Sequence, residues 1–182
     1  MNESNESLDL SYKSQPNSLT PNSSGLPEDN IPIVYFGISV VRLVCLFLLT
    51  FGFYKFYWFY KNWKAIKNTE RSDISPFWRS CFSIFFCHEL FEKIEEAVTS
   101  YSNKKPFSAS WLSGWYIIFC VIGLGFFNLF ILMSVQKAIN FNNKQLIPGY
   151  KPLKKFDDVE IIFIIIGSLL WLIGILRGCL EA

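Results

Sequence analysis

The chain has 182 residues, of which 51% are hydrophobic and only 18% charged, so it carries more apolar surface than one water-soluble core of this length needs. Nineteen Phe, eight Tyr and six Trp add rings that suit the boundary between lipid tails and headgroups. The net charge of +2 does not support nucleic-acid binding, so the composition argues against an ordinary soluble domain and favours a membrane protein.

Residues 1–30 are rich in Ser, Asn, Glu and Pro and contain almost no branched apolar residues. Such a segment cannot bury enough surface to offset the entropy of ordering it. We predict a disordered polar tail over 1–30 and a helical transmembrane domain over 31–182. The tail has no basic stretch leading into a short apolar run, so we do not expect a secretory signal peptide.

The first apolar stretch, 31–54, contains a single charge, Arg42. A helix needs roughly 20 apolar residues to cross about 30 Å of hydrocarbon, so this stretch predicts a first span. An arginine inside a span is costly unless it is paired or hydrated, which makes Arg42 the leading functional candidate. Asn128 and Glu89 are its candidate partners. Its role stays open between tying helices together and lining an ion or solute path.

An aromatic run over 51–60 leads into basic residues at helical spacing. We predict an amphipathic continuation of the first span, with Phe59, Trp63 and Ile66 on a different face. Its cations are expected at the lipid interface, where each contributes about 1 kcal/mol of attraction to anionic headgroups. This basic face consists of Lys61, Lys64, Lys67 and Arg71.

The next apolar stretch, 76–94, is short for a span. The run between Arg79 and Glu89 covers about 15 Å as a helix, which is half a bilayer. It either spans as a short shielded helix or lies in the interface. His88 is the only histidine, and with Glu92 it offers two metal positions at most. We therefore predict a structural role for His88 and Glu89, with no metal and no catalytic site.

Two later stretches have the composition of spans. Residues 111–135 carry no charge, and 159–180 carry only Glu160 and Arg177, near ends from which charged side chains reach the interface. The chain is therefore predicted to be an all-α membrane protein with a four-helix transmembrane bundle. Three spans plus an interfacial helix are the alternative, if 76–94 does not cross.

Basic residues gather on the cytoplasmic side of membrane proteins. With four spans and the amino-terminal tail outside, the inner loops hold ten of the 17 Lys and Arg residues, so we expect the tail outside. A short echo, Lys-Ala-Ile at 64–66 and again at 137–139, suggests two similar hairpins and favours four spans.

Several motifs resemble a known family. Thr50-Phe51-Gly52-Phe53-Tyr54 and the following YWFYKNWK over 57–64 are similar to the Thr-x-Gly-x-Tyr and Tyr-Trp signature of a domain-of-unknown-function family. That family comprises small bacterial inner-membrane proteins. The resemblance covers roughly 35–176 and implies a multi-pass helical fold in a bacterial inner membrane. It implies no activity and no binding residue. Further similar segments are 76–79, 135–140 and 167–171.

From the sequence we expect a non-enzymatic accessory or scaffold protein of the inner membrane. Its expected partners are membrane lipids, together with further copies of itself or other membrane proteins. We expect no cofactor, no metal and no nucleic acid. The alternative is a subunit of a small channel or transporter in which Arg42 and Asn128 line a hydrated path. Four helices rarely enclose such a path, so this alternative requires an oligomer.

Overall fold

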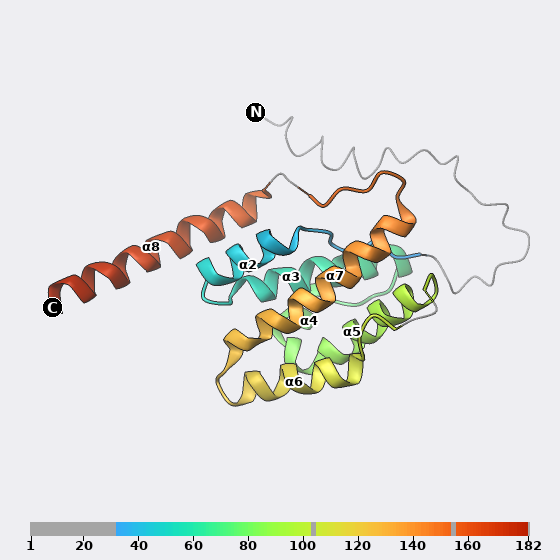
Figure 1. Cartoon of the computed structure of the whole chain (residues 1–182), viewed down its shortest axis with the longest axis horizontal. Coiled ribbons are helices and arrows are strands. Elements are labelled where there is room, and N and C mark those ends of the chain that lie inside the picture. Colours follow the sequence, from blue (N-terminus) through green and yellow to red (C-terminus); the bar gives the residue numbers. More distant parts are fainter. Residues whose placement is uncertain (1–31, 103–104, 154–155, 182) are drawn as a thin grey trace, which may run out of the picture. The chain divides into compact units, whose positions relative to one another are not determined.

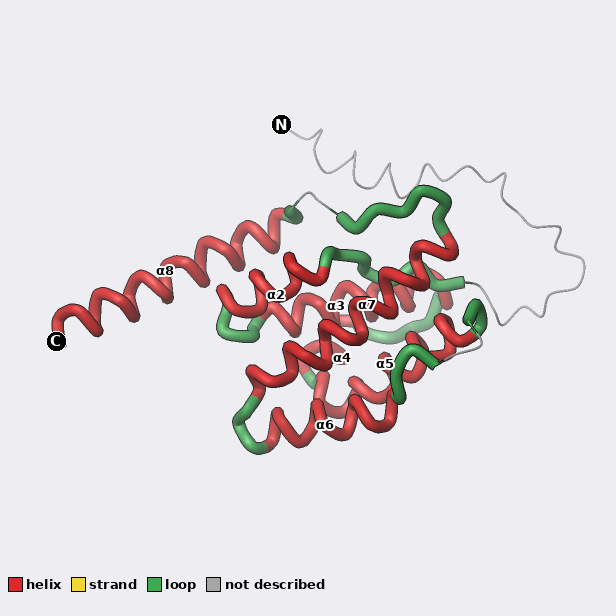
Figure 2. The backbone as a smooth tube through the Cα atoms, viewed as in Figure 1, coloured by secondary structure: helices red, strands yellow, loops and turns green. Residues whose placement is uncertain are grey.

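The computed structural model of the chain describes residues 32–102, 105–153 and 156–181, so the tail predicted over 1–30 lies outside the described residues. Within them the fold is all-helical, as predicted, and contains no strand; one isolated backbone bridge joins Ile38 to Leu153. The order of the helices can be followed in Figure 1 and Figure 2. They are α2 (Val40–Leu49), α3 (Tyr54–Glu70), α4 (Pro76–Cys81), α5 (Ser83–Thr99), α6 (Ala109–Val121), the 3-10 turn η1 (Gly125–Phe127), α7 (Asn128–Leu146) and α8 (Asp158–Glu181).

The first predicted span, 31–54, is not one helix. Residues 32–39 are extended, and α2 covers only ten residues before the chain reverses at Phe51 and Gly52. Both residues have positive φ (52° and 86°), a left-handed conformation that glycine adopts without strain. The prediction of a continuous helix over 31–54 is wrong, because hydrophobicity alone does not reveal a left-handed turn.

Thr50 closes this turn through its hydroxyl group. The hydroxyl donates to the carbonyl of Leu46 (2.8 Å) and accepts from the N–H of Tyr54 (3.0 Å), so one side chain ends α2 and begins α3. α3 then runs back past α2 (Figure 1), and is a separate helix rather than the predicted continuation of the first span. Thr, Gly and Tyr in the Thr50-to-Tyr54 motif thus each serve the hairpin.

The predicted span over 111–135 is a hairpin too. α6 ends at Val121, Gly123 (φ 81°) reverses the chain, and η1 leads into α7 at Asn128. The expectation of a continuous helix is wrong here for the same reason as in the first span. α6 and α7 both pack against α5, as the tube in Figure 2 shows.

The short stretch 76–94 is divided between two helices. α4 has six residues, with proline in its first turn, and the chain breaks at Phe82 before α5 begins at Ser83. α5 continues to Thr99, beyond the predicted stretch. The option of a single short spanning helix over 76–94 is therefore wrong, because the apolar run belongs partly to each helix.

α8 coincides with the predicted span over 159–180. Its apolar part, Asp158–Cys179, has 22 residues, and it is the one described helix that is long and apolar enough to cross a membrane. Only 11% of its most apolar window is buried, so α8 is not a core helix of this unit. This feature indicates association with a membrane.

Aromatic side chains fill the core between α3, α5, α6 and α7. Phe59, Trp63 and Ile66 are fully buried, so the predicted separation of an apolar face from the basic face of α3 is confirmed. The ring of Phe59 packs against Phe91 and Tyr116, with centroids 6.1 and 5.6 Å away. These contacts hold the two hairpins and α5 in one unit.

Candidate functional site

A buried ion pair joins the first turns of α2 and α8. Ser39 caps α2 by accepting from the N–H of Arg42 (3.2 Å), and the Arg42 guanidinium pairs with the Glu160 carboxylate. The two side chains are 9% and 0% exposed. Nη1 of Arg42 also donates to the carbonyl of Leu153 (2.9 Å), and the guanidinium lies over the ring of Phe156 (4.3 Å).

The Glu160 carboxylate receives two further donors. The hydroxyl of Tyr54 donates to it at 2.6 Å, and the backbone N–H of Asp157 donates at 3.0 Å. A buried carboxylate without partners costs several kcal/mol, whereas this one is bound on both oxygens. It also lies in the first turn of α8, where a negative charge complements the helix dipole.

A second, more accessible pair lies beside the first. Asp157 accepts from the hydroxyl of Tyr57 and from Nζ of Lys61, both at 2.6 Å. Burial alone raises the pKa of Asp157, but the hydrogen bonds from Lys61 and Tyr57 outweigh it and hold the pKa below its usual range. We call the whole set the α8 base network: Arg42, Tyr54, Tyr57, Lys61, Asp157 and Glu160.

The structure does not bring Arg42 to either partner expected from the sequence. Asn128 is fully buried, and its amide nitrogen donates to Sγ of Cys120 (3.0 Å). Glu89 pairs with Arg79 at 2.5 Å. The expected pairings are therefore wrong. Arg42 is the single charge of its apolar stretch, but the stretch over 159–180 contains both Glu160 and Arg177, so the sequence does not single out this pair.

The ion pair with Glu160 neutralises the charge of Arg42. This pairing favours one of the two roles that the sequence left open for Arg42. Arg42 ties α2 to α8, and both its partner and its ring contact leave little of it exposed. Asn128 lies elsewhere, between α6 and α7. The two residues proposed to line a hydrated path do not meet, so the geometry favours a structural tie over a path.

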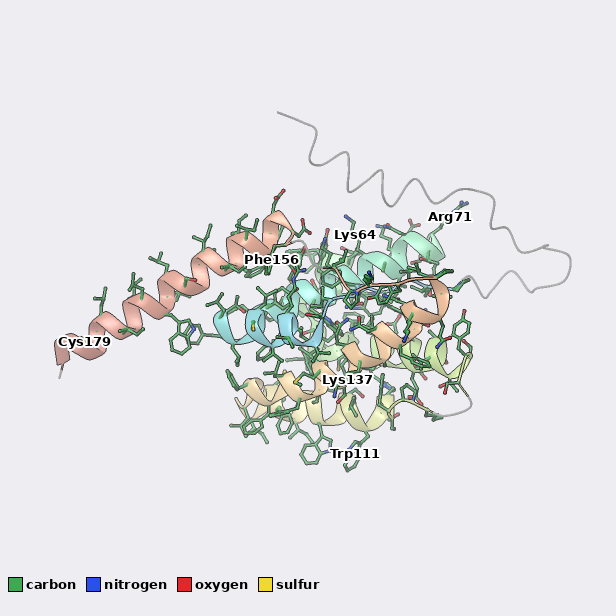
Figure 3. All side chains as sticks on the ribbon, turned by 45° about the horizontal axis from the view of Figure 1, so that its top comes forward. Lys64, Arg71, Trp111, Lys137, Phe156 and Cys179 are labelled. Carbon is green, nitrogen blue, oxygen red and sulfur yellow. The ribbon has the colours of Figure 1, made fainter. Side chains whose placement is uncertain are left out.

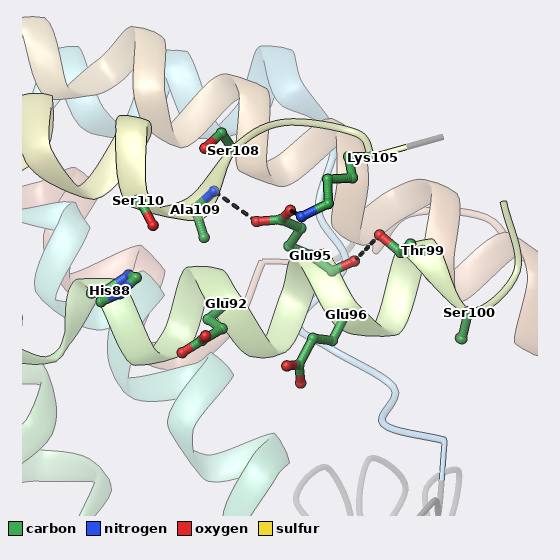
Figure 4. A pocket seen from close by; sticks show the side chains of 10 residues that line it. All are labelled: His88, Glu92, Glu95, Glu96, Thr99, Ser100, Lys105, Ser108, Ala109 and Ser110. Carbon is green, nitrogen blue, oxygen red and sulfur yellow. Dashed lines mark hydrogen bonds and ion pairs between the residues drawn. The ribbon is translucent and has the colours of Figure 1, made fainter. Parts of the chain in front are cut away.

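His88 and Glu92 border an open groove of about 440 Å³ between α5 and the start of α6 (Figure 4). Both side chains are exposed, and Nδ1 of His88 lies 3.4 Å from the hydroxyl of Ser113. Among the described residues no group of three potential metal ligands comes together. The groove is lined mainly by polar and charged side chains of α5 and of the start of α6.

Glu95 closes the far side of this groove and caps α6. Its carboxylate accepts from the N–H of Ala109 (2.7 Å) and pairs with Nζ of Lys105 (2.8 Å), as Figure 4 shows. Burial by itself raises the pKa of Glu95, but the hydrogen bonds from Lys105 and Ala109 more than offset it and lower the pKa. The role of Glu95 is structural.

The predicted basic face is present in part. Lys64, Lys67 and Arg71 are exposed on α3, and Figure 3 shows Lys64 and Arg71 projecting away from the core. Lys61 turns inward to Asp157 instead. Three of the four cations therefore form an exposed basic surface, and the fourth belongs to the α8 base network.

The sequence analysis missed a set of buried amides that bind the extended segment 32–39. Asn143 accepts from the N–H of Tyr35 (3.1 Å) and donates to its carbonyl (2.7 Å). Asn62 accepts from the N–H of Phe36 (3.2 Å), and Asn140 donates to the carbonyl of Ile38 (2.8 Å). We call this set the amide clamp: Asn62, Gln136, Asn140, Asn142 and Asn143.

The amide clamp could have been predicted from the several Asn residues in the run over 136–143. Asparagine is a poor helix former, so several Asn residues within an apolar helix indicate that their side chains have partners. Backbone groups in a buried extended segment need such partners. The signal predicts a clamp but does not identify the segment that it holds.

No family model matches the chain, and neither a curated protein nor a solved structure matches it. The resemblance of the Thr50-to-Tyr54 motif to an inner-membrane family therefore stays a prediction. The function has to be argued from the geometry of the chain itself.

Proposed function

We propose that the protein is a non-enzymatic accessory or scaffold protein of a bacterial cytoplasmic membrane, anchored by α8. The observation that carries this proposal is the exposure of α8: large hydrophobic side chains from Val159 to Leu176 are exposed along the helix. Each fully exposed side chain of this kind forfeits about 1.5–3 kcal/mol relative to burial, so α8 requires an apolar surrounding. At about 1.5 Å per residue its apolar part matches the thickness of a bilayer core.

The sequence predicted four membrane-spanning helices, whereas this proposal has a single helix that crosses the membrane. α2 and α6 have ten and 13 residues. At about 1.5 Å per residue they reach about 15 and 20 Å, short of the hydrocarbon thickness of about 30 Å. α8 therefore supplies the anchor, and the hairpins contribute the rest of the protein's body.

Charge supports one orientation of this arrangement. Sixteen of the 17 Lys and Arg residues precede Asp158 in the chain, and Arg177 alone follows it. The positive-inside rule then puts the hairpins on the cytoplasmic side and the end of α8 outside. In this orientation Tyr35 and the clamp lie on the cytoplasmic side, whereas the sequence analysis expected the tail over 1–30, which lies outside the described residues, on the outer side.

The proposal that the protein is not an enzyme rests on the bonding partners of its buried polar groups. Arg42 and Glu160 bind each other, and the clamp amides bind backbone. These groups stabilise the fold. The exposed cations Lys64, Lys67 and Arg71 offer a surface for anionic headgroups or acidic partner segments.

Cell fractionation tests the proposal. Full-length protein should sediment with membranes and resist extraction by alkaline carbonate, whereas a variant ending at Ile164, which keeps Glu160 and its partners Arg42 and Tyr54, should lose that resistance. Gly174→Leu is the control substitution within α8, because nothing lies within 4 Å of a Cβ added there and the change adds apolar surface. Full-length protein that stays folded in the supernatant without detergent would contradict the proposal.

A further inference from the structure

The two hairpin turns carry exposed apolar side chains that the anchor does not explain. Phe51 and Phe53 are 50% and 61% exposed at the α2–α3 turn. Val121, Ile122 and Phe126 are 74%, 64% and 55% exposed at the α6–α7 turn. We propose that both turns enter the lipid hydrocarbon beside α8 and return to the side from which they came. This inference rests on the proposed membrane location.

The two turns lie close to each other and to the middle of α8. The rings of Phe47 and Phe126 meet edge to face at 6.0 Å, and Phe51 stacks on Trp171 at 5.0 Å. A Cβ at Gly167 would collide with the Leu49 carbonyl oxygen, so α8 touches the last turn of α2. The turns therefore continue the exposed surface of α8.

The position of these contacts along α8 sets the depth of the turns. Trp171 is 13 residues beyond Asp158 in the sequence. At about 1.5 Å per residue this places the α2–α3 turn about 20 Å along the helix, within a hydrocarbon core of about 30 Å. The turns would thus reach past the middle of the bilayer without crossing it.

Charge is absent from the two turns. No charged residue occurs in 43–54 or in 111–136. The nearest cation, Lys55, is partly buried between the hairpins, with Nζ 3.8 Å from Sγ of Cys120 and 5.9 Å from the centre of the Tyr116 ring. A cation enclosed in this way costs less in a membrane than one facing lipid.

Three amides at the hairpin turns are bonded to nearby carbonyls, as hydrocarbon requires. Gly52 N–H donates to the carbonyl of Phe47 (2.7 Å), and Phe53 N–H donates to that of Thr50 (3.0 Å). In the second hairpin, Ile122 N–H donates to the carbonyl of Ile118 at 2.9 Å. These amides do not depend on water.

The two hairpins share a sequence register. Gly52-Phe53 and Gly125-Phe126 each precede a Lys-Ala-Ile motif, with the lysine 12 residues after the glycine in both (64 − 52 and 137 − 125). The isoleucines of the two motifs, Ile66 and Ile139, are both fully buried. The glycine that reverses the second hairpin is Gly123, two residues before Gly125, so the shared spacing is a similarity of sequence and does not align the two reversing glycines.

Spin-label accessibility tests the proposal. Single cysteines replace Phe53 and Ile122 at the turns, and Asn68 and Lys144 serve as matched positions on exposed faces of α3 and α7. Each nitroxide-labelled protein, in a background without the five native cysteines, is placed in vesicles of phosphatidylethanolamine and phosphatidylglycerol. Cosedimentation with the vesicles first establishes that each variant is inserted.

We expect labels at Phe53→Cys and Ile122→Cys to collide more often with oxygen, which concentrates in hydrocarbon, than with a water-soluble nickel chelate. The ratio of oxygen collisions to nickel collisions should be at least tenfold lower at Asn68→Cys and Lys144→Cys than at the two turn positions. Inserted protein with nickel-accessible turns would overturn the inference while leaving the anchor intact. Turns shielded from both reagents would also overturn it, because they would indicate cover by a second copy.

Discussion

The two ends of the hairpin unit satisfy the chain's backbone in different ways. At the clamp end, side-chain amides such as Asn143 bond to the extended segment 32–39. At the turn end, the N–H groups of Gly52 and Ile122 bond to carbonyls of the preceding helices, and the apolar side chains of Phe53 and Ile122 are exposed. Under the proposed membrane location, the turns meet lipid tails and the clamp end lies toward water.

The α8 base network lies between the clamp end and the turn end. Substitutions in this network should cause the largest losses of stability. Arg42→Leu or Glu160→Leu alone leaves a buried charge unpaired, and we expect each to lower stability by about 3–5 kcal/mol. The double variant should lose much less than the sum, because neither charge remains. Thermal unfolding in mild detergent, monitored by circular dichroism, measures all three.

If the loss of stability in the double variant equalled the sum of the losses in the two single variants, that result would contradict the pairing. Lys93→Ala is a matched control, because its pair with Glu70 has side chains 30% and 35% exposed. A surface pair of this kind contributes about 0–1 kcal/mol.

The clamp end can be weakened separately. Asn143→Leu removes the partners of both the N–H and the carbonyl of Tyr35, and we expect a loss of about 2–4 kcal/mol. Asn68→Leu on the exposed face of α3 should change stability by less than about 0.5 kcal/mol. Faster amide hydrogen exchange at Tyr35 in the first variant alone would locate the effect. Equal effects of the two substitutions would show that the clamp does not hold the segment.

The turn end is tested through the contact between α2 and α8. Gly167→Ala places a methyl group against the Leu49 carbonyl, and we expect a loss of about 1–3 kcal/mol. Gly174→Ala meets nothing within 4 Å and should be neutral or stabilise by up to about 1 kcal/mol through helix propensity. A denaturation series in detergent compares the pair. Identical effects would mean that α8 does not pack on α2.

The smallest effect concerns pH at the clamp end. The pKa of Glu95 is lowered in the folded protein, so Glu95 stabilises the fold above the pKa of about 4.3 that an unfolded glutamate has. This contribution is lost as the pH falls through the lowered pKa. Glu95→Gln should therefore flatten the pH dependence of the melting temperature on the acid side. An unchanged profile would exclude Glu95 as its source.

The sequence predicted the helical class, the α8 helix and the exposed part of the basic face, because each depends on local composition or spacing. It did not predict the breaks at Gly52 and Gly123, since an apolar stretch reads the same whether the chain runs straight or reverses. The sequence also did not predict that Arg42 pairs with Glu160 or that Asn143 bonds to Tyr35. Each of these bonds joins residues more than 100 positions apart, and the spacing of residues along the chain does not reveal such contacts.

The central claim is that α8 crosses the membrane while both hairpins return to the cytoplasmic side. The most direct test labels single cysteines with a membrane-impermeant maleimide in intact and permeabilised cells, at Ser100→Cys in the α5–α6 connection and at a cysteine appended after Ala182. The account predicts that the appended cysteine reacts in intact cells and that Ser100→Cys reacts only after permeabilisation. Labelling of Ser100→Cys in intact cells would contradict the account and restore a chain that crosses before α6.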